Sequence, residues 1–372
     1  MKSIGIICEF NPFHNGHAYF INKVKEKYPD HIIILVLNGY FLERGELSVL
    51  SKENKTKISL ENKIDIVTEL PVIFGTQSAD TFAEKSVEIL NNLMVDKIVF
   101  GSECNDSTKL KVLAQHQLND SSYHLNVKKH LKMGLNYPTA LAKAFNKNNF
   151  ESTPNDILGL AYIKAALKNN FNIKFDTIKR TNSFHDNTLK DSIVSASNIR
   201  QRYGENENIE AYMPKEYISS LKKIDYDKLF YILKTKILTD KDLSIYLDVD
   251  EGIENKLKKD IITVTNYKDL VFAIKNKRFT YNKINRMFIH ILLGITKNDA
   301  TSKLLYTKIL GLSINGKKYL ASIKKNVEIP ILVDKNSTVY EYEIKAAMLY
   351  EILTNSKVYQ FENSNKPIIN NT

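Results

Sequence analysis

The stretch SIGIICEFNPFHNGHAYF, residues 3–20, contains the pattern on which the fold prediction depends. Residues 3–10 form an apolar run of the kind found in a central parallel strand that is covered on both faces. After an Asn-Pro turn, residues 16–28 carry apolar side chains at near-helical spacing. His14 and His17 flank an Asn-Gly pair at this junction. The junction is either a turn that happens to contain histidines or a phosphate-binding site.

The chemistry of the junction favours the phosphate site. Ligands of α/β proteins bind at the carboxyl ends of parallel strands. A helix beginning near Gly16 directs unpaired N–H groups and the positive end of its dipole at that edge, and a glycine allows close approach of the backbone. The imidazoles of His14 and His17 lie one helical turn apart, so they face the same way. Such donors stabilise the negative charge that develops when an α-phosphate is attacked.

The pattern of strand followed by helix continues through the first 203 residues. Alternation of this kind predicts right-handed βαβ units on a parallel sheet, which is a Rossmann-like α/β fold. A polar, helical insertion is expected at about residues 105–150, and the domain is expected to end near Tyr203. The further predicted strands are 31–38, 64–70, 97–103 and 172–180, and the further predicted helices are 51–64, 78–93 and 154–169.

Two common nucleotide sites are excluded by their motifs. The sequence contains no G-x-x-x-x-G-K-[ST] pattern, so it lacks the Walker A loop. The turn after the first strand has no G-x-G-x-x-G, which excludes the dinucleotide fingerprint.

Residues 204–372 no longer alternate between strand and helix patterns. Their helical patterns predict a second, mostly helical domain. Only the short apolar piece at 327–334 suggests a strand there, and the tail at 362–372 is expected to be frayed. The apolar segment 287–295 is about half the length of a membrane span and is expected to be a core helix.

Composition favours a protein of the reducing cytosol. The chain has two cysteines, Cys8 and Cys104, without metal-ligand spacing, so we expect two small buried side chains rather than a disulfide or zinc site. The apolar N-terminal run is too short for a signal peptide, and no segment is long enough to span a membrane. A cytoplasmic location follows as an expectation, and the oligomeric state is left open.

The net charge of +11 is concentrated in one region, because residues 251–350 alone carry +9. This excess indicates either an anionic partner such as nucleic acid or a lysine-rich solvated surface. Aromatic side chains at Phe279 and Tyr281 are interleaved with the basic cluster, which suits phosphate contacts combined with base stacking on RNA. The same cluster also fits one solvated helical face. The predicted RNA-binding residues are Lys275, Lys277, Arg278, Lys283 and Arg286. A second basic cluster in the insertion, Lys128, Lys129 and Lys132, is expected to extend the same RNA-binding surface.

Several motifs together resemble one family. NPFHNGH (11–17), NGYFLERGE (38–46), PNDILG (154–159), RTNSFHD (180–186) and SASNIR (195–200) occur in the order seen in the tRNA(Met) cytidine acetate ligases of the HIGH-type nucleotidyltransferase superfamily. The basic segment KNKRFTYNKINRM, residues 275–287, also resembles that family. The resemblance covers most of the chain. HNGH alone identifies only the superfamily, whereas NPFHNGH combined with the GYFxxRGE segment is much more specific.

The resemblance implies an ATP-dependent ligase. Members of the family form acetyladenylate from acetate and ATP and acetylate the wobble cytidine of elongator tRNA(Met), giving N4-acetylcytidine. It implies His14 and His17 at the reacting centre, and Mg²⁺ is expected to screen the triphosphate. The residues implied to contact ATP are Ile7, Cys8, Glu9, Phe10, Asn11, Pro12, Phe13, His14, Asn15, Gly16, His17, Ala18, Tyr19, Phe20, Gly101, Asn155, Arg180, Ser195, Ser197 and Arg200.

The sequence departs from the family's motifs at some positions, and the roles of several residues stay open. The family usually reads PNN where this chain has Pro154-Asn155-Asp156, and RGEPA where it has residues 44–48. Asn155 either contacts ATP or only caps its helix. Arg44 and Glu46 form either a loop salt bridge or part of a loop that closes over the adenylate. His185 and Asp186 are either a general base with its orienting carboxylate or a surface pair. The alternative functions are a small-molecule adenylyltransferase and a non-catalytic RNA-binding protein.

Overall fold

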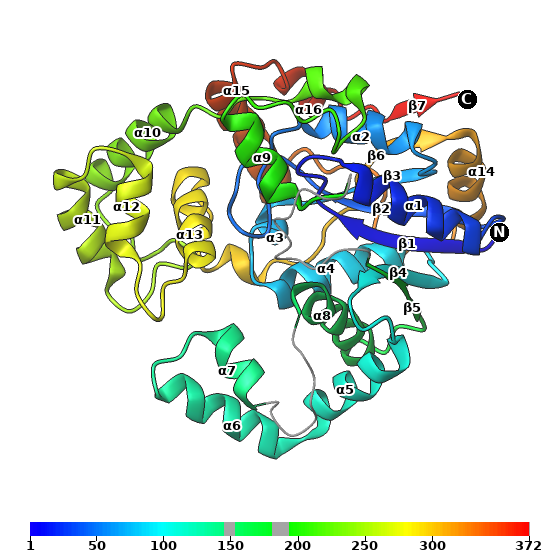
Figure 1. The fold of residues 1–372 in the computed structure, drawn as a ribbon, viewed down its shortest axis with the longest axis horizontal. Coiled ribbons are helices and arrows are strands. Elements are labelled where there is room, and N and C mark those ends of the chain that lie inside the picture. Colours follow the sequence, from blue (N-terminus) through cyan, green and yellow to red (C-terminus); the bar gives the residue numbers. More distant parts are fainter. Residues whose placement is uncertain (145–152, 181–192, 372) are drawn as a thin grey trace.

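The computed structural model describes residues 1–144, 153–180 and 193–371. Seven strands form one sheet in the order β5-β4-β1-β2-β3-β6-β7 (Figure 1). The first five are parallel, as the sequence predicts, and their order is that of the first five strands of the classic Rossmann sheet. They are β1 (Ser3–Cys8), β2 (Ile32–Asn38), β3 (Ile66–Leu70), β4 (Lys97–Ser102) and β5 (Lys174–Lys179).

Both faces of the sheet are covered, which explains why its strands are continuously apolar. In β2, Ile32, Ile34 and Val36 enter one hydrophobic core, and Ile33, Leu35 and Leu37 enter another. The second core also contains residues of α1 (Asn15–Lys27), α2 (Lys52–Glu61) and α9 (Ala196–Gly204). The first core contains α4 (Ala79–Asn92) and α8 (Pro154–Lys168), with the short α3 (Val72–Gly75).

The insertion is helical, as predicted. Its described part forms α5 (Ser107–Asn119), α6 (Ser121–Lys132) and α7 (Tyr137–Ala144). Figure 1 shows α6 and α7 extending away from the sheet.

Residues 226–293 form a helical unit with a hydrophobic core of its own. Its helices are α10 (Tyr226–Thr239), α11 (Ile253–Thr263), α12 (Tyr267–Ile274) and α13 (Tyr281–Leu293). The segment predicted as a core helix at 287–295 lies largely in α13, where even His290 is fully buried. A 3-10 turn, Lys215–Ser220, precedes this unit, and another, Asp299–Thr301, follows it.

The C-terminal residues return to the sheet, which the sequence did not predict. β6 (Ile309–Ser313) pairs antiparallel with β3, and β7 (Ile368–Asn370) pairs parallel with β6. The expected frayed tail therefore contains a strand. The apolar piece at 327–334 is not a strand, because its residues lie in bends and loops. The domain boundary near Tyr203 stays a prediction. The remaining helices are α14 (Ile314–Ile323), α15 (Thr338–Thr354) and α16 (Tyr359–Ser364).

A buried ionic cluster joins this C-terminal part to the N-terminal strands. Lys52 of α2 is fully buried and forms ion pairs with Glu69, with Glu343 at 2.6 Å and with Glu362 at 2.8 Å. The ammonium of Lys308 forms further ion pairs with Glu69 and Glu362. Burial alone lowers the pKa of Lys52, but the three carboxylates outweigh it and hold that pKa well above its ordinary value. Lys52 is therefore a cation at the centre of the cluster.

Candidate active site

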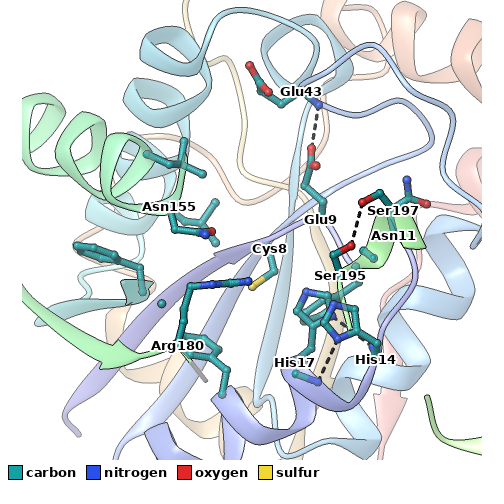
Figure 2. A pocket seen from close by; sticks show the side chains of 18 of the residues that line it. Cys8, Glu9, Asn11, His14, His17, Glu43, Asn155, Arg180, Ser195 and Ser197 are labelled. Atoms are coloured by element: carbon teal, nitrogen blue, oxygen red, sulfur yellow. Dashed lines mark hydrogen bonds between the residues drawn. The ribbon is translucent and has the colours of Figure 1, made fainter. Parts of the chain in front are cut away.

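A cavity of about 340 Å³ lies at the carboxyl ends of β1 and β4, where the strand order of the sheet reverses. This is where open α/β sheets bind ligands. Figure 2 shows His14 and His17 on one side of the cavity and Asn155 and Arg180 on the other. Its walls come from the end of β1, the start of α1, residues 42–46, the ends of β4 and β5, and the starts of α8 and α9.

His14 caps the first helix with its own ring. α1 begins at Asn15, and Nδ1 of His14 accepts a hydrogen bond from the Gly16 amide at 3.0 Å. Nδ1 of His17 accepts from the His14 amide at 3.3 Å, and the two ring centroids lie 3.9 Å apart. Because both Nδ1 atoms accept, the neutral rings carry their protons on Nε2. Both histidines line the cavity, so they supply neutral Nε2–H donors there.

The electrostatics of the site keep both rings neutral. Burial, together with the guanidinium groups of Arg180 and Arg200, lowers the pKa of His14 to about 3. Burial, His14 and Arg180 lower the pKa of His17 well below its ordinary value. A cavity bordered by two arginines and a helix N-terminus is suited to a polyanion.

Arg200 connects three segments around the cavity. Its Nη1 donates to the Asn11 carbonyl at 2.8 Å, and its Nη2 donates to the Glu46 carboxylate at 2.6 Å. Ser195 is the N-cap of α9, and its hydroxyl lies 3.0 Å from that of Ser197. Ser195, Ser197 and Arg200, which the resemblance implies to contact ATP, line the same cavity as the histidines.

Asn155 and Arg180 meet through an acidic residue. Thr153, not Asn155, is the N-cap of α8, so a capping role for Asn155 is wrong. The Nδ2 of Asn155 donates to the acidic residue Glu103 at 2.6 Å. The Glu103 carboxylate also lies 3.3 Å from Nε of Arg180. Gly101 lines the cavity beneath Arg180, whose Cγ would lie 3.4 Å from an added Cβ.

The neighbouring Asp156, a departure from the family pattern, has a structural position. It is 1% exposed and accepts hydrogen bonds from Ser102, Thr153 and the Cys104 amide. These bonds hold the end of β4 against the start of α8, which positions Asn155.

Ten of the fourteen residues predicted around the first turn line the cavity. The other four, Pro12, Phe13, Asn15 and Ala18, do not. Phe13 is fully buried and packs on Tyr217, and Asn15 donates from its amide and side chain to carbonyls of residues 211–212. These four residues lie on the faces of the turn and of α1 that are directed away from the cavity.

The loop of residues 38–46 is packed rather than free. Phe41 and Leu42 are almost fully buried, and Glu46 forms an ion pair with Arg200. Gly45 has φ of +72°, and a Cβ there would lie 2.2 Å from the backbone nitrogen of Arg286 in α13. Only glycine permits this contact between the loop and the C-terminal helical unit.

Sequence reasoning missed Lys55, whose fully buried ammonium lies beneath this loop. It donates to the carbonyls of Glu9 at 2.9 Å, Asn38 at 2.8 Å and Gly39 at 2.7 Å. It thereby fixes the ends of β1 and β2 that carry the cavity wall. The sequence around Lys55 has the pattern of a solvent-exposed helix, so no local sequence signal predicts that Lys55 is buried. Phe82, Leu158 and Tyr162 also line the cavity and were not predicted.

Three of the five predicted RNA-binding residues pair with an acidic loop, residues 248–251. These pairs join Arg278 to Glu251 at 2.6 Å, Lys283 to Asp250 at 3.5 Å and Arg286 to Asp248 at 3.5 Å. Lys275 and Lys277 are exposed. The basic cluster is thus partly neutralised by the chain itself.

The expected stacking role of Phe279 is wrong, because its ring is 3% exposed and belongs to the core of the helical unit. Tyr281 is 47% exposed, and the Lys275 ammonium lies 4.4 Å from its ring centroid. Arg286 is only 13% exposed and also lies 3.5 Å from the Glu43 carboxylate. The expected pair His185 and Asp186 lies outside the described residues.

The described residues do not form a carboxylate cluster for Mg²⁺ beside the histidines. Among them, the one group of three close carboxylates is Glu69, Glu343 and Glu362. Those carboxylates already hold Lys52 and Lys308, so they do not fit a resident metal. Both cysteines are free thiols, and burial raises the pKa of Cys8 to about 12. No helix within the described ranges is long and apolar enough to cross a membrane.

Comparisons with known proteins agree with this geometry. A family model described as HIGH Nucleotidyl Transferase matches residues 1–366. The chain is 36% identical to the tRNA(Met) cytidine acetate ligase of Geobacillus sp. (strain WCH70), with 94% of each chain covered. It is 35% identical to that of Caldicellulosiruptor saccharolyticus, covering 95% of this chain and 94% of that protein.

Solved structures give the same result. Over the full length of both chains, the structure matches apo Thermotoga maritima TmcAL with a TM-score of 0.89 and 27% identity. It matches TmcAL bound with alpha-thio ATP with a TM-score of 0.88 and the same identity. The chain therefore belongs to the tRNA(Met) cytidine acetate ligase family of HIGH nucleotidyltransferases.

Proposed function

We propose that this chain forms acetyladenylate from ATP and acetate and transfers the acetyl group to the exocyclic amine of the wobble cytidine in elongator tRNA(Met). The observation that carries the proposal is the pair of neutral imidazoles at the N-terminus of α1, in a cavity bordered by Arg180 and Arg200. The names of the relatives support acetate and tRNA(Met) as substrates. The ATP analogue in TmcAL supports ATP.

In the first step, an acetate oxygen attacks the α-phosphorus of ATP, and pyrophosphate leaves. Nε2–H groups of His14 and His17 donate to the phosphoryl oxygens, on which negative charge grows in the transition state. The positive end of the α1 dipole and the guanidinium of Arg200 act on the same charge. These donors are held by the cap and by the Asn11 carbonyl, so they need no reorganisation.

The remaining predicted contacts belong to the same proposal. Gly101, Asn155 and Arg180 hold the nucleoside side of ATP, while Ser195 and Ser197 contact the distal phosphates. The N–H groups at the start of α9 and the Ser195 hydroxyl are suited to that role. Mg²⁺ would accompany the triphosphate as its counter-ion and would neutralise part of its charge.

In the second step, the cytidine amine attacks the acetyl carbonyl and AMP leaves. An anticodon base is already single-stranded, so exposing it costs little. The exposed lysines Lys275 and Lys277 supply phosphate contacts in this proposal. We place the reaction in the cytoplasm, where such a tRNA is found.

The test is pyrophosphate–ATP exchange with purified protein, with and without acetate, followed by other small carboxylates. Exchange that depends on acetate supports adenylate formation. Radiolabelled acetate is then supplied with tRNA(Met) transcripts that carry either cytidine or uridine at the wobble position. Label should enter only the cytidine transcript. Absence of exchange, both without RNA and with the transcript, would refute the proposal.

The small-molecule adenylyltransferase is the second candidate. It explains the N-terminal site equally well, but it gives no role to the basic residues around α13. Relatives that match over the C-terminal region as well support an RNA acceptor. RNA binding that weakens steeply with salt would favour the ligase, because phosphate contacts release counterions.

A further inference from the structure

A second cavity, of about 840 Å³, lies beside the cavity that contains His14 and His17. The cavity with the histidines is called the ATP cavity below. The second cavity is bounded by the insertion, by the start of α4, by one side of α8, and by α13 with the acidic loop. Its size lies within the range of about 300–1,000 Å³ that is typical of small-molecule sites. Apolar side chains on its walls are Leu131, Leu135, Leu141, Ile157 and Leu160.

The two cavities share one wall. Glu43 lines both of them. α8 also separates them, with Leu158 and Tyr162 toward the ATP cavity and Leu160 and Ala161 toward the second. In Figure 2 the Glu43 side chain points away from the histidines, while its backbone amide donates to Glu9 at 2.8 Å. A molecule in the second cavity therefore approaches the nucleotide past Glu43.

We propose that the second cavity receives the acceptor base of the RNA and that Glu43 takes up the proton that the exocyclic amine loses. This inference rests on the proposed function and deepens it. Leucine and isoleucine side chains suit the face of a pyrimidine, and cations from both sides of the opening suit the flanking phosphates. These cations are Lys132 of the insertion and Arg278 and Lys283 near α13, of which the last two also pair with the acidic loop.

The transfer step balances in atoms and charge. The amine nitrogen forms a bond to the acetyl carbon, and the bond from that carbon to the AMP oxygen breaks. AMP leaves as the phosphate dianion and needs no proton. The nitrogen loses one proton to the Glu43 carboxylate, which becomes a neutral acid, and the product is the N-acetylated base.

The surroundings of Glu43 suit a base at neutral pH. It faces Arg286 of α13 at 3.5 Å, and Glu9 just after β1 also acts on it, as do Arg44 and Glu46 from its own loop. Asp248 shares Arg286 at 3.5 Å, and the other charged groups around the second cavity are Asp80, Lys132, Lys164, Glu251, Arg278 and Lys283. Burial raises the pKa of Glu43 to about 7, with Arg286 opposing and Glu9 adding to the rise. A carboxylate with this pKa is well matched to proton transfer at neutral pH.

The test compares the two half-reactions in Glu43→Gln, which keeps the shape and removes the basic carboxylate. Loss of a general base typically costs about 10²–10⁴ in rate. We expect the ratio of acetyl transfer to acetate-dependent pyrophosphate exchange to fall at least about 10²-fold. Single-turnover transfer by the wild type should rise with pH through about 7, because the base must be ionised, and the variant should lose this rise. An unchanged ratio, or an equal loss of both half-reactions, would overturn the role of Glu43.

A second variant tests the cavity itself. Asn282 is exposed on α13 and lines the second cavity, so Asn282→Trp narrows it. We expect a raised KM for tRNA with exchange retained, whereas Asn255→Trp on the exposed side of α11 should change neither. Wild-type KM in Asn282→Trp would overturn the assignment of the cavity. If the wild-type protein itself exchanges pyrophosphate but acetylates no RNA, the proposed function fails first, so the two failures are distinguishable.

Discussion

His14 has two roles that a pair of variants can separate. Its Nδ1 caps α1, and its Nε2–H is a donor in the proposed adenylation step. His14→Ala removes both. His14→Asn keeps a side-chain acceptor at the N-cap, where asparagine is among the preferred residues, and removes only the imidazole donor.

The magnitudes of the two losses differ. Losing a cap costs about 1 kcal/mol of unfolding free energy, whereas losing one oxyanion donor costs about 2.7–4 kcal/mol of barrier. The latter corresponds to about 10²–10³ in rate. Acetate-dependent pyrophosphate–ATP exchange should therefore fall by this factor in both variants, and urea unfolding should show a stability loss only in His14→Ala. Exchange within about threefold of wild type in folded His14→Asn would refute the donor role.

The same histidine gives a prediction for pH. Because burial, Arg180 and Arg200 lower the pKa of His14 to about 3, its ring stays neutral from mildly acidic to alkaline pH. Protonation affects it only as the pH falls toward 3, so kcat/KM for ATP should show no inflection near 6.5. An inflection at that pH that disappears in His14→Asn would contradict a neutral donor.

Three further outcomes follow from packing and charge. Lys52→Met leaves buried carboxylates without their central cation and should lower unfolding free energy by about 3–5 kcal/mol in urea titrations, against at most about 0.5 for the exposed Lys57→Met. Gly45→Ala forces a Cβ into the backbone of α13, so a lowered melting temperature is expected; an unchanged one would show that the loop can move. Glu251→Gln releases Arg278, so RNA binding at low salt should tighten by a few-fold in filter-binding assays.

The sequence alone determined the features that depend on local patterns. The continuous apolar runs predicted the parallel strands, because a strand buried on both faces needs no polar alternation. The spacing of His14, Gly16 and His17 predicted a strand-to-helix turn with both imidazoles on one side, since one helical turn brings two side chains to one face.

Tertiary structure alone decided the features whose partners are distant in the sequence. Lys52 reads as a surface residue, but its carboxylate partners at positions 343 and 362 lie about 300 residues away. β7 was expected to be frayed because its three residues carry little strand signal until β6 supplies a pairing edge. Glu43 borders two cavities only because α13 packs against its loop. Local sequence records periodicity and capping, whereas burial of charge and the shape of cavities depend on which distant segments meet.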